Sequence, residues 1–168
     1  MATTDVPTPD AEALLRQARA LQTNAYAPYS GFRVGAVVVT ADGQVFEGVN
    51  VENASYRLTT CAEQTALAMM ATAGVRSPVV AVAVVGDGPE PCTPCGACRQ
   101  TVAEFGPDAT VHAAGSEPDG PVLTTQIAEL LPYGFGAERL AAGQRPAADD
   151  GAVPGADDAV GRTDRGGA

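Results

Sequence analysis

Several features that define other classes of protein are missing from this sequence of 168 residues. No apolar run approaches the roughly 20 residues that a helix needs to span a bilayer, which argues against a membrane protein. The first ten residues have neither a basic start nor an apolar stretch, so we expect no secretory signal and a cytoplasmic location. The 10 Lys and Arg residues are outnumbered by 20 Asp and Glu residues, and the net charge of −10 disfavours binding to nucleic acid.

Histidine occurs once and cysteine only four times. Disulfides are rare in a reducing compartment, where clustered cysteines more often bind metal or take part in chemistry. His112 lies in an alternation of polar and apolar residues on an expected strand, and we interpret it as a structural residue. The cysteines are therefore the first candidates for a functional site.

Length and hydrophobic periodicity indicate an α/β domain. With 168 residues, 45% of them apolar, the chain is long enough to bury a core. The order of the expected elements, α-β-β-α-β-α-β-α, predicts one mixed sheet with helices packed on it, and there is no internal repeat. The expected helices cover about residues 9–25, 61–73, 94–106 and 125–131, and the expected strands cover 34–40, 44–50, 79–85 and 109–113.

The composition changes near the end of the sequence. From about Ala141 onward the chain consists largely of Ala, Gly, Pro and Asp, with almost nothing large to bury. Such a composition is typical of disorder. We therefore expect a folded domain over residues 1–140 and a disordered tail over residues 141–168.

Three of the cysteines fall at the expected starts of two helices. Cys95 and Cys98 have the C-x-x-C spacing and share one face of a helix, and Cys61 opens another helix. Helix N-termini favour anions, so both helices would help to hold the sulfurs as thiolates. Catalytic zinc sites typically have three protein ligands and leave the fourth position to water. The three cysteines therefore predict a zinc site, and no fourth protein ligand is evident.

Glu63 follows Cys61 by two residues, in the first turn of the same expected helix. A carboxylate there can exchange protons with a reacting water, although alone it would be interpreted as an acid favoured by the helix dipole. Zinc deaminases combine such a glutamate, which is not a ligand, with a later P-C-x-x-C segment. Cys61-Ala62-Glu63 followed by Pro94-Cys95-Gly96-Ala97-Cys98 reproduces that combination, which is far more specific than C-x-x-C alone.

Further segments extend this pattern over about residues 10–140. They are Phe32-x-Val34-Gly35-Ala36, Asn50-Val51-Glu52-Asn53-Ala54-Ser55-Tyr56, Arg99-Gln100 after Cys98, and Leu130-Leu131-Pro132 followed by Phe135. In order and spacing the sequence resembles the small, tetrameric class of cytidine deaminases, whose three cysteines bind one zinc ion per subunit. The resemblance implies a three-layer α/β/α domain with a mixed sheet of about five strands, and a homotetramer that acts on a pyrimidine nucleoside.

The resemblance also implies which residues hold the sugar. Asn50 and Glu52 are two apart at a strand end and so project to the same side, where an amide and a carboxylate would together bind a ribose hydroxyl. The negative charge of Glu52 would disfavour a nearby phosphate, and therefore a nucleotide. Contacts around the ribose 2′ position cannot be identified from the sequence, so both cytidine and 2′-deoxycytidine are expected substrates.

Other substrate contacts are implied at Phe32, Ala54, Tyr56, Ala62 and Phe135. The two phenylalanines match positions where the family packs aromatic rings around the pyrimidine. Phe135 and Tyr56 would enter the site of a neighbouring subunit, which would make oligomerisation part of catalysis. A backbone amide near Ala62 would help to orient the ring.

Two positions near the cysteines need separate interpretation. Many relatives have Arg directly after C-A-E, whereas this chain has Gln64. We expect Arg99, together with the two helix N-termini, to offset the net charge of −1 on a zinc ion bound by three thiolates. Cys92 lies three residues before Cys95, and as a fourth ligand it would close the site. We interpret Cys92 as a free loop thiol, because the matching segment begins at Pro94.

The sequence therefore predicts zinc-dependent hydrolytic deamination of cytidine, and of 2′-deoxycytidine, in pyrimidine salvage, with Glu63 transferring the protons. One alternative is a zinc deaminase of another substrate, such as a nucleoside antibiotic, guanine or a base in nucleic acid. The Asn50–Tyr56 segment and the acidic charge argue against it. The other alternative is a structural zinc or interaction module, which gives no reason for Glu63.

Overall fold

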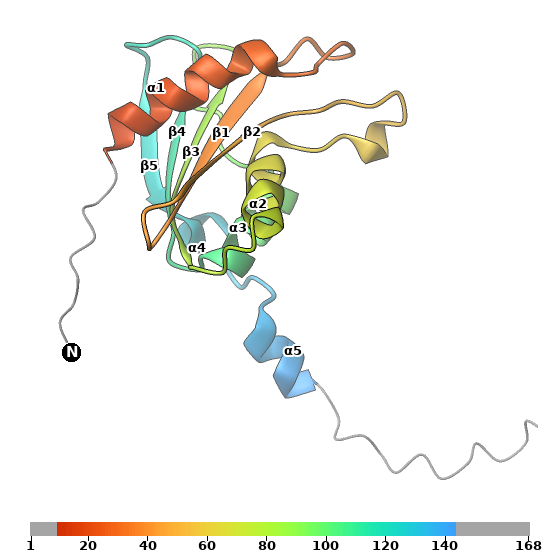
Figure 1. Ribbon diagram of the computed structural model, residues 1–168, viewed down its shortest axis with the longest axis vertical. Helices are drawn as coiled ribbons and strands as arrows, with labels where there is room; N and C mark the ends of the chain where they lie inside the picture. The colour runs from red at the N-terminus through yellow and green to blue at the C-terminus, as the bar shows by residue number, and fades with distance from the viewer. Residues whose placement is uncertain (1–9, 144–168) are drawn as a thin grey trace, which may run out of the picture. The chain divides into compact units, whose positions relative to one another are not determined.

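The computed structural model describes residues 10–143, and the chain divides into two units between Phe135 and Gly136. The described part of the second unit contains helix α5 (Ala137–Gly143), and the other elements belong to the first unit. Those elements, shown in Figure 1, are α1 (Ala11–Leu21), β1 (Val34–Thr40), β2 (Val45–Val49), α2 (Ala62–Thr72), β3 (Val79–Gly86), α3 (Gly96–Phe105), β4 (Thr110–Ala114), β5 (Val122–Gln126) and α4 (Ile127–Leu130), with 3-10 turns at Gln22–Asn24 and Tyr56–Leu58.

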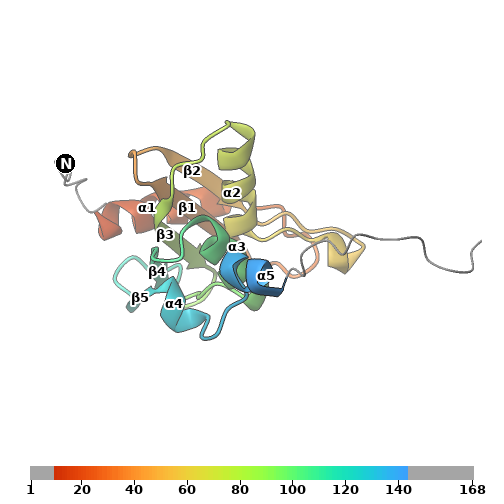
Figure 2. The ribbon, with the colours of Figure 1, turned by 90° about the horizontal axis from the view of Figure 1, so that it is seen from below.

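The strands form one mixed sheet of five, in the order β2-β1-β3-β4-β5, which can be followed across Figure 2. Strand β1 is antiparallel to β2 and β3, β3 is parallel to β4, and β5 is antiparallel to β4. The parallel pair requires a crossover, which α3 supplies. The central strand β3 is buried along nearly its full length, as its continuous apolar run predicts.

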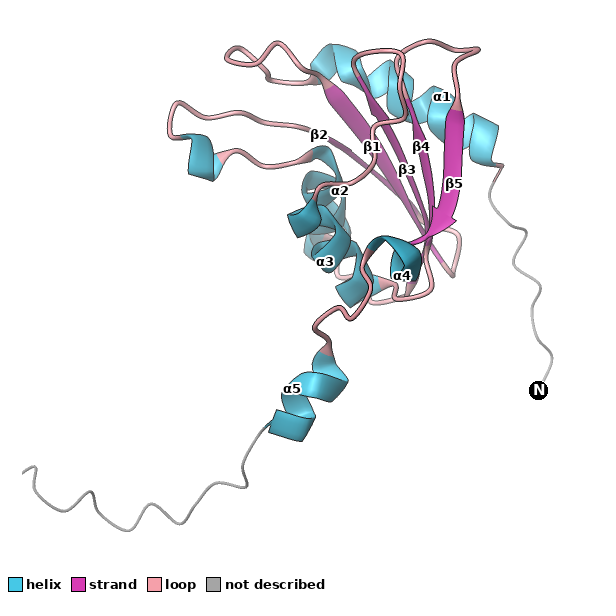
Figure 3. Cartoon of the chain, turned by 180° about the vertical axis from the view of Figure 1, so that it is seen from behind, coloured by secondary structure: helices cyan, strands magenta, loops and turns pink. Residues whose placement is uncertain are grey.

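Helices cover both faces of the sheet, which confirms the three-layer arrangement. Helix α1 packs against β1 and β3 on one face, and α2, α3 and α4 lie on the other face (Figure 3). Side chains of β1 alternate between the two layers: Val37 and Val39 pack with Leu14 of α1, whereas Ala36 and Val38 belong to the core under α2 and α3. The sheet is therefore buried on both sides.

The first helix is shorter than its sequence pattern predicts. Asp10 caps it, since its side chain accepts a hydrogen bond of 3.1 Å from the backbone N–H of Glu12. The first residue of the expected helix, Pro9, lies outside the described residues. The α-helix ends at Leu21 and continues as a 3-10 turn rather than reaching residue 25.

The expected helix over residues 125–131 is wrong in its first part. Thr125 and Gln126 belong to β5, an edge strand that the hydrophobic pattern does not predict. Gln126 is the N-cap of α4, where it forms a capping box with Glu129. The expected helix is therefore present, but it begins two residues later than predicted. Most side chains of β5 are exposed, and the strand consequently lacks the alternation that marks a half-buried strand.

The expected tail over residues 141–168 falls mostly outside the described residues. Residues 141–143 complete helix α5 and residues 144–168 are not described. Across residues 10–143, none of the helices combines the length and apolarity that a bilayer span requires.

Candidate active site

Three cysteine side chains from two helix N-termini form a cluster on the α2 and α3 face of the sheet. Cys61 is the N-cap residue of α2, Cys95 is the N-cap residue of α3, and Cys98 lies in the first turn of α3. Their sulfur atoms all lie within 4.8 Å of one another, and Sγ of Cys61 is 3.8 Å from Sγ of Cys95. The predicted positions of the three cysteines at helix starts are thus confirmed.

The geometry of the cluster fits a zinc ion. Tetrahedral zinc with Zn–S bonds of about 2.3 Å separates its sulfur ligands by roughly 3.8 Å. The Sγ–Sγ distance between Cys61 and Cys95 has this value. Among the described residues, the metal-binding group consists of these three cysteines and excludes Cys92. The donor set is therefore that of an open zinc site rather than a closed four-cysteine one.

The thiols of the cluster are linked electrostatically. A hydrogen bond from the Cys98 thiol lowers the pKa of Cys61 to about 7, against the opposing effects of burial and of Glu63. The same hydrogen bond and burial raise the pKa of Cys98. Backbone N–H groups at the start of a helix favour a negative charge, so the two N-caps are suited to thiolates. Cys61 therefore ionises more readily than Cys98.

A glycine in β2 determines how closely the N-terminus of α2 approaches the sheet. A Cβ atom at Gly48 would lie 2.3 Å from the carbonyl oxygen of Ala62 and 2.4 Å from the backbone nitrogen of Ala66. Any side chain at this position would displace the first turn of α2. That turn contains Glu63 and follows directly on Cys61, so the close approach fixes both residues.

Glu63 is a buried acid beside the sulfur cluster, and its side chain is only 4% exposed. Burial raises the pKa of its carboxyl, although hydrogen bonds from its own backbone and from Cys98 oppose the rise. A carboxyl with a raised pKa both accepts and returns a proton more readily near neutral pH. Glu63 therefore has the position and the environment of a proton-transfer group.

A cavity of about 160 Å³ opens in front of the cluster. Glu63, Cys61 and Cys95 line it together, and the remaining lining residues are Val34, Asn50, Thr59, Ala62, Cys92 and Thr93. Burial raises the pKa of the Cys92 thiol to about 11, so this side chain is a neutral part of the wall. Gly86 leaves room for the Cys92 side chain, because a Cβ atom at Gly86 would lie 2.6 Å from Sγ of Cys92 and 3.1 Å from the Phe32 ring.

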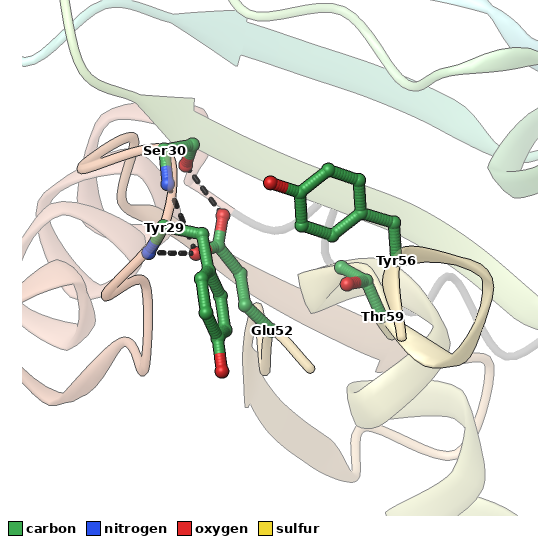
Figure 4. Close-up of a pocket in the computed structure, with 5 residues that line it drawn as sticks. All are labelled: Tyr29, Ser30, Glu52, Tyr56 and Thr59. Atoms are coloured by element: carbon green, nitrogen blue, oxygen red, sulfur yellow. Dashed lines mark hydrogen bonds between the residues drawn. The ribbon is translucent and has the colours of Figure 1, made fainter. Parts of the chain in front are cut away.

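A second cavity of about 310 Å³ shares Thr59 with the first. It is lined by Tyr29, Ser30, Glu52 and Tyr56 in addition to Thr59 (Figure 4). The Glu52 carboxylate accepts hydrogen bonds from the backbone N–H groups of Tyr29 and Ser30, at 2.8 and 3.2 Å, and from the Ser30 hydroxyl at 2.5 Å. These bonds, above all that from the hydroxyl, lower the pKa of Glu52.

Asn50 and Glu52 thus line different cavities, which share one wall residue. The Asn50 side chain is buried, and both ends of its amide bind the backbone at the start of β1. Its Nδ2 donates to the carbonyl of Phe32 at 2.9 Å, and its Oδ1 accepts from the N–H of Val34 at 2.8 Å. Asn50 consequently has a structural role in addition to lining the metal cavity.

The other expected substrate contacts divide into two groups. Tyr56 lines the second cavity and packs edge-to-face on Tyr29 with ring centroids 6.1 Å apart, yet it is 76% exposed. Phe135 is 60% exposed, and Gln100 donates a hydrogen bond of 2.7 Å to its carbonyl. Ala62 lines the cavity beside the cysteines, whereas neither described cavity is lined by Phe32, Ala54 or Phe135 from the same chain.

Arg99 binds backbone carbonyls. Its Nε donates to the carbonyl of Pro94 at 2.8 Å and its guanidinium also donates to the carbonyl of Leu130 at 3.0 Å. Arg99 therefore connects the loop before Cys95 with α4. Gln64, which occupies the position next to Glu63, is half-buried.

The interpretation of His112 as a structural residue agrees with its surroundings. His112 is buried in β4, and its Nδ1 lies 3.0 Å from Oγ1 of Thr124 on β5. Burial lowers its pKa, so the ring is neutral at physiological pH. The residues that the sequence analysis missed are Tyr29, Ser30, Thr59 and Thr93, together with Cys92 as a wall residue; none carries a pattern that marks it in the sequence.

Three thiols at two helix starts, with a buried carboxyl beside them on an α/β sheet, are the arrangement of the zinc-binding deaminases. Residues 8–114 match the family model of the cytidine and deoxycytidylate deaminase zinc-binding region, and the chain belongs to this family. Zinc binding is thus a property of the family, and Cys61, Cys95 and Cys98 provide a metal site for it.

Individual relatives agree with this assignment. A cytidine deaminase from Halalkalibacterium halodurans is 47% identical over 78% of this chain and 98% of its own length. One from Sporosarcina psychrophila is 42% identical, with 78% of this chain and 95% of that protein covered. The crystal structure of cytidine deaminase from Burkholderia pseudomallei superposes with a TM-score of 0.69 at 50% identity, covering 73% of this chain and 97% of that one.

Proposed function

We propose that this protein hydrolyses cytidine to uridine and ammonia, with Cys61, Cys95 and Cys98 as zinc ligands and Glu63 as the proton-transfer residue. The observation that supports this most directly is that Glu63, Cys61 and Cys95 line one cavity. The choice of substrate is supported by the relatives, which are named cytidine deaminases and which this chain matches over nearly their full length.

The chemistry requires a nucleophile and a group that moves two protons. Zinc bound at the three sulfurs would lower the pKa of water toward 7 and so provide hydroxide at neutral pH. The Glu63 carboxylate accepts the proton of the attacking water and delivers it to N3 of the base as the oxygen adds to C4. Glu63 then transfers the proton of the new C4 hydroxyl to the amino group. Ammonia leaves, and the C4 carbonyl of uridine remains.

The two cavities suit the two parts of a nucleoside. The smaller one, with Glu63 and the sulfurs, would accept the pyrimidine beside Phe32 and a backbone amide near Ala62. The larger one, with Glu52, would accept the sugar. The lowered pKa of Glu52 keeps its carboxylate charged, which favours a hydroxyl partner and repels a phosphate. We infer that both cytidine and 2′-deoxycytidine are substrates and that nucleotides are not.

We further propose that the working form is a homotetramer in the cytoplasm that serves pyrimidine salvage. The exposed rings of Tyr56 and Phe135 support a shared site, because large aromatic side chains at a surface are typical of interfaces. In that arrangement Tyr56 and Phe135 would contact substrate bound to a neighbouring subunit. Ala54, which is exposed two residues before Tyr56, belongs to the same surface segment.

A substrate panel tests the proposal. Purified zinc-loaded protein is incubated with cytidine, 2′-deoxycytidine, cytidine 5′-monophosphate, cytosine, guanine and a nucleoside antibiotic, and ammonia release is measured. We expect turnover of the two nucleosides and at least a hundredfold lower kcat/KM for the nucleotide and the free base. Turnover of guanine or of a nucleoside antibiotic in place of cytidine would show another deaminase. Bound zinc without turnover of any substrate would show a structural metal.

A further inference from the structure

The Ser30 hydroxyl links the residue proposed to bind the sugar with the residue proposed to contact the base. Its Oγ donates to Oε1 of Glu52 at 2.5 Å and accepts from the backbone N–H of Phe32 at 2.9 Å. Figure 4 shows Ser30 and Tyr29 on one side of the Glu52 carboxylate, with the dashed bonds between them. One hydroxyl thus fixes the position of a side chain and of a peptide group.

The hydrogen bonds of Glu52 leave a specific acceptor position open. A carboxylate has about four lone-pair sites, two on each oxygen. Oε2 accepts from the N–H groups of both Tyr29 and Ser30, whereas Oε1 accepts from the Ser30 hydroxyl alone. Among the described hydrogen bonds, therefore, one acceptor position of the Glu52 carboxylate remains open. It is on Oε1, which accepts from the Ser30 hydroxyl. The backbone of Glu52 is also fixed, because its N–H donates to the carbonyl of Tyr26 at 2.8 Å.

The Phe32 peptide is held from both sides. The Ser30 hydroxyl binds its N–H, and Nδ2 of Asn50 donates to its carbonyl at 2.9 Å. Ser30 therefore connects Glu52 with the Phe32 backbone through direct hydrogen bonds, and Asn50 holds that backbone from its other side. Ser30 and Glu52 are 22 positions apart in the chain.

We propose that Ser30 is a positioning residue for sugar recognition: its hydroxyl orients the Glu52 carboxylate so that the remaining acceptor site of Oε1 receives a ribose hydroxyl. This inference rests on the proposed nucleoside deaminase function. Without the Ser30 hydroxyl, Oε1 has no partner from this loop and the carboxylate can rotate. Binding of the sugar is then weakened by the conformational entropy that is lost when the carboxylate becomes fixed. The loss is larger for substrates that carry the hydroxyl, because the Phe32 backbone keeps its hydrogen bond from Nδ2 of Asn50 when the Ser30 hydroxyl is removed.

The test compares two substrates in two variants. Ser30→Ala removes the hydroxyl, and Ser30→Thr keeps it. Cytidine carries both ribose hydroxyls, and 2′,3′-dideoxycytidine carries neither. For Ser30→Ala we expect kcat/KM to fall about 10-fold for cytidine, mainly through a higher KM, and by less than about 3-fold for the dideoxy analogue. Ser30→Thr retains wild-type discrimination between the two substrates. Ser116→Ala, which removes another loop hydroxyl bonded to a backbone carbonyl, changes neither value.

The outcomes separate the role of Ser30 from the function itself. Equal losses for the two substrates in Ser30→Ala, or an unchanged KM for cytidine, would overturn the positioning role. A wild-type protein that deaminates neither substrate would instead overturn the proposed function. If melting curves show that Ser30→Ala is unfolded, Ser30→Cys, whose thiol is a weak donor, replaces it with the same expected substrate-dependent loss. A double-mutant cycle with Glu52→Gln should show non-additive losses for cytidine.

Discussion

Sγ of Cys61 and Sγ of Cys95 lie 3.8 Å apart, although the residues are 34 positions apart and cap different helices. The distance exists only because α2 and α3 pack on the same face of the sheet and against each other. A metal held between two such helix starts binds the folded chain in preference to the unfolded one. Zinc binding should therefore stabilise the fold as well as supply the chemistry.

The cysteine cluster makes a prediction about which thiols hold the metal. Cys95→Ser should reduce zinc from about one ion per chain to a small fraction of that, because three sulfurs form the site. Cys92→Ser should keep the zinc, since Cys92 lies in the same cavity but outside the cluster. Metal content of the purified variants, measured by atomic emission, checks both expectations. Equal zinc loss in the two variants would make Cys92 a ligand.

The burial of Glu63 predicts an effect on turnover rather than on metal binding. Glu63→Gln preserves the size of the side chain but removes the proton acceptor, so kcat should fall about 10²–10⁴-fold while zinc content is unchanged. Glu104→Gln, an exposed acid on α3, is the matched control and should retain full activity. Turnover followed by the loss of cytidine absorbance measures the effect. Activity within a few-fold of wild type in Glu63→Gln would refute its role.

The close approach of α2 to β2 predicts the effect of one methyl group. Gly48→Ala places a Cβ atom 2.3 Å from the carbonyl oxygen of Ala62, so the helix must shift. We expect the free energy of unfolding to fall by about 1–3 kcal/mol and zinc affinity to fall with it. Gly136→Ala, where a Cβ atom meets nothing within 4 Å, is the control. Chemical denaturation and a competitive chelator titration measure the two quantities, and an unchanged Gly48→Ala variant would contradict the packing argument.

The hydrogen bonds of Arg99 allow its structural and electrostatic roles to be separated. Neither Arg99→Lys nor Arg99→Gln can bind the carbonyls of Pro94 and Leu130 as the guanidinium does, so both should lower stability by about 1–3 kcal/mol. Only Arg99→Gln removes the positive charge, and only it should raise the pKa that governs turnover. Denaturation curves and pH–rate profiles measure these effects. Identical profiles for the two variants would show that the charge of Arg99 does not compensate the thiolates.

The parts of the fold that sequence predicts well are those with strong local signals. Helix α2 covers residues 62–72 against an expected 61–73, because Gly74, with φ of 77°, ends it. Strand β3 begins at the expected Val79, since its apolar run is continuous. Strand β5 was missed because it is an exposed edge strand, whose pairing with β4 exists only in the folded sheet.

The candidate site likewise contains residues with strong local signals and residues whose contacts arise only in the folded chain. Cys61, Glu63 and the C-x-x-C pair were predictable because each sits at a helix start in a recognisable spacing. The bond between Ser30 and Glu52 was not, because it depends on how a loop folds back over 22 residues. The two-residue spacing of Asn50 and Glu52 predicts that both bind the same ribose hydroxyl. In the structure Asn50 binds the backbone and lines the cavity beside the cysteines, whereas Glu52 lines the second cavity.

The proposed catalysis depends most on an open zinc site beside Glu63, and removal of the metal tests this dependence directly. Cytidine turnover and zinc content are measured on the same purified sample before dialysis against a chelator, after dialysis, and after one equivalent of zinc is restored. We predict about one zinc ion per chain, loss of turnover in proportion to zinc loss, and recovery of both on restoration. Full turnover in protein that retains no metal would contradict the account.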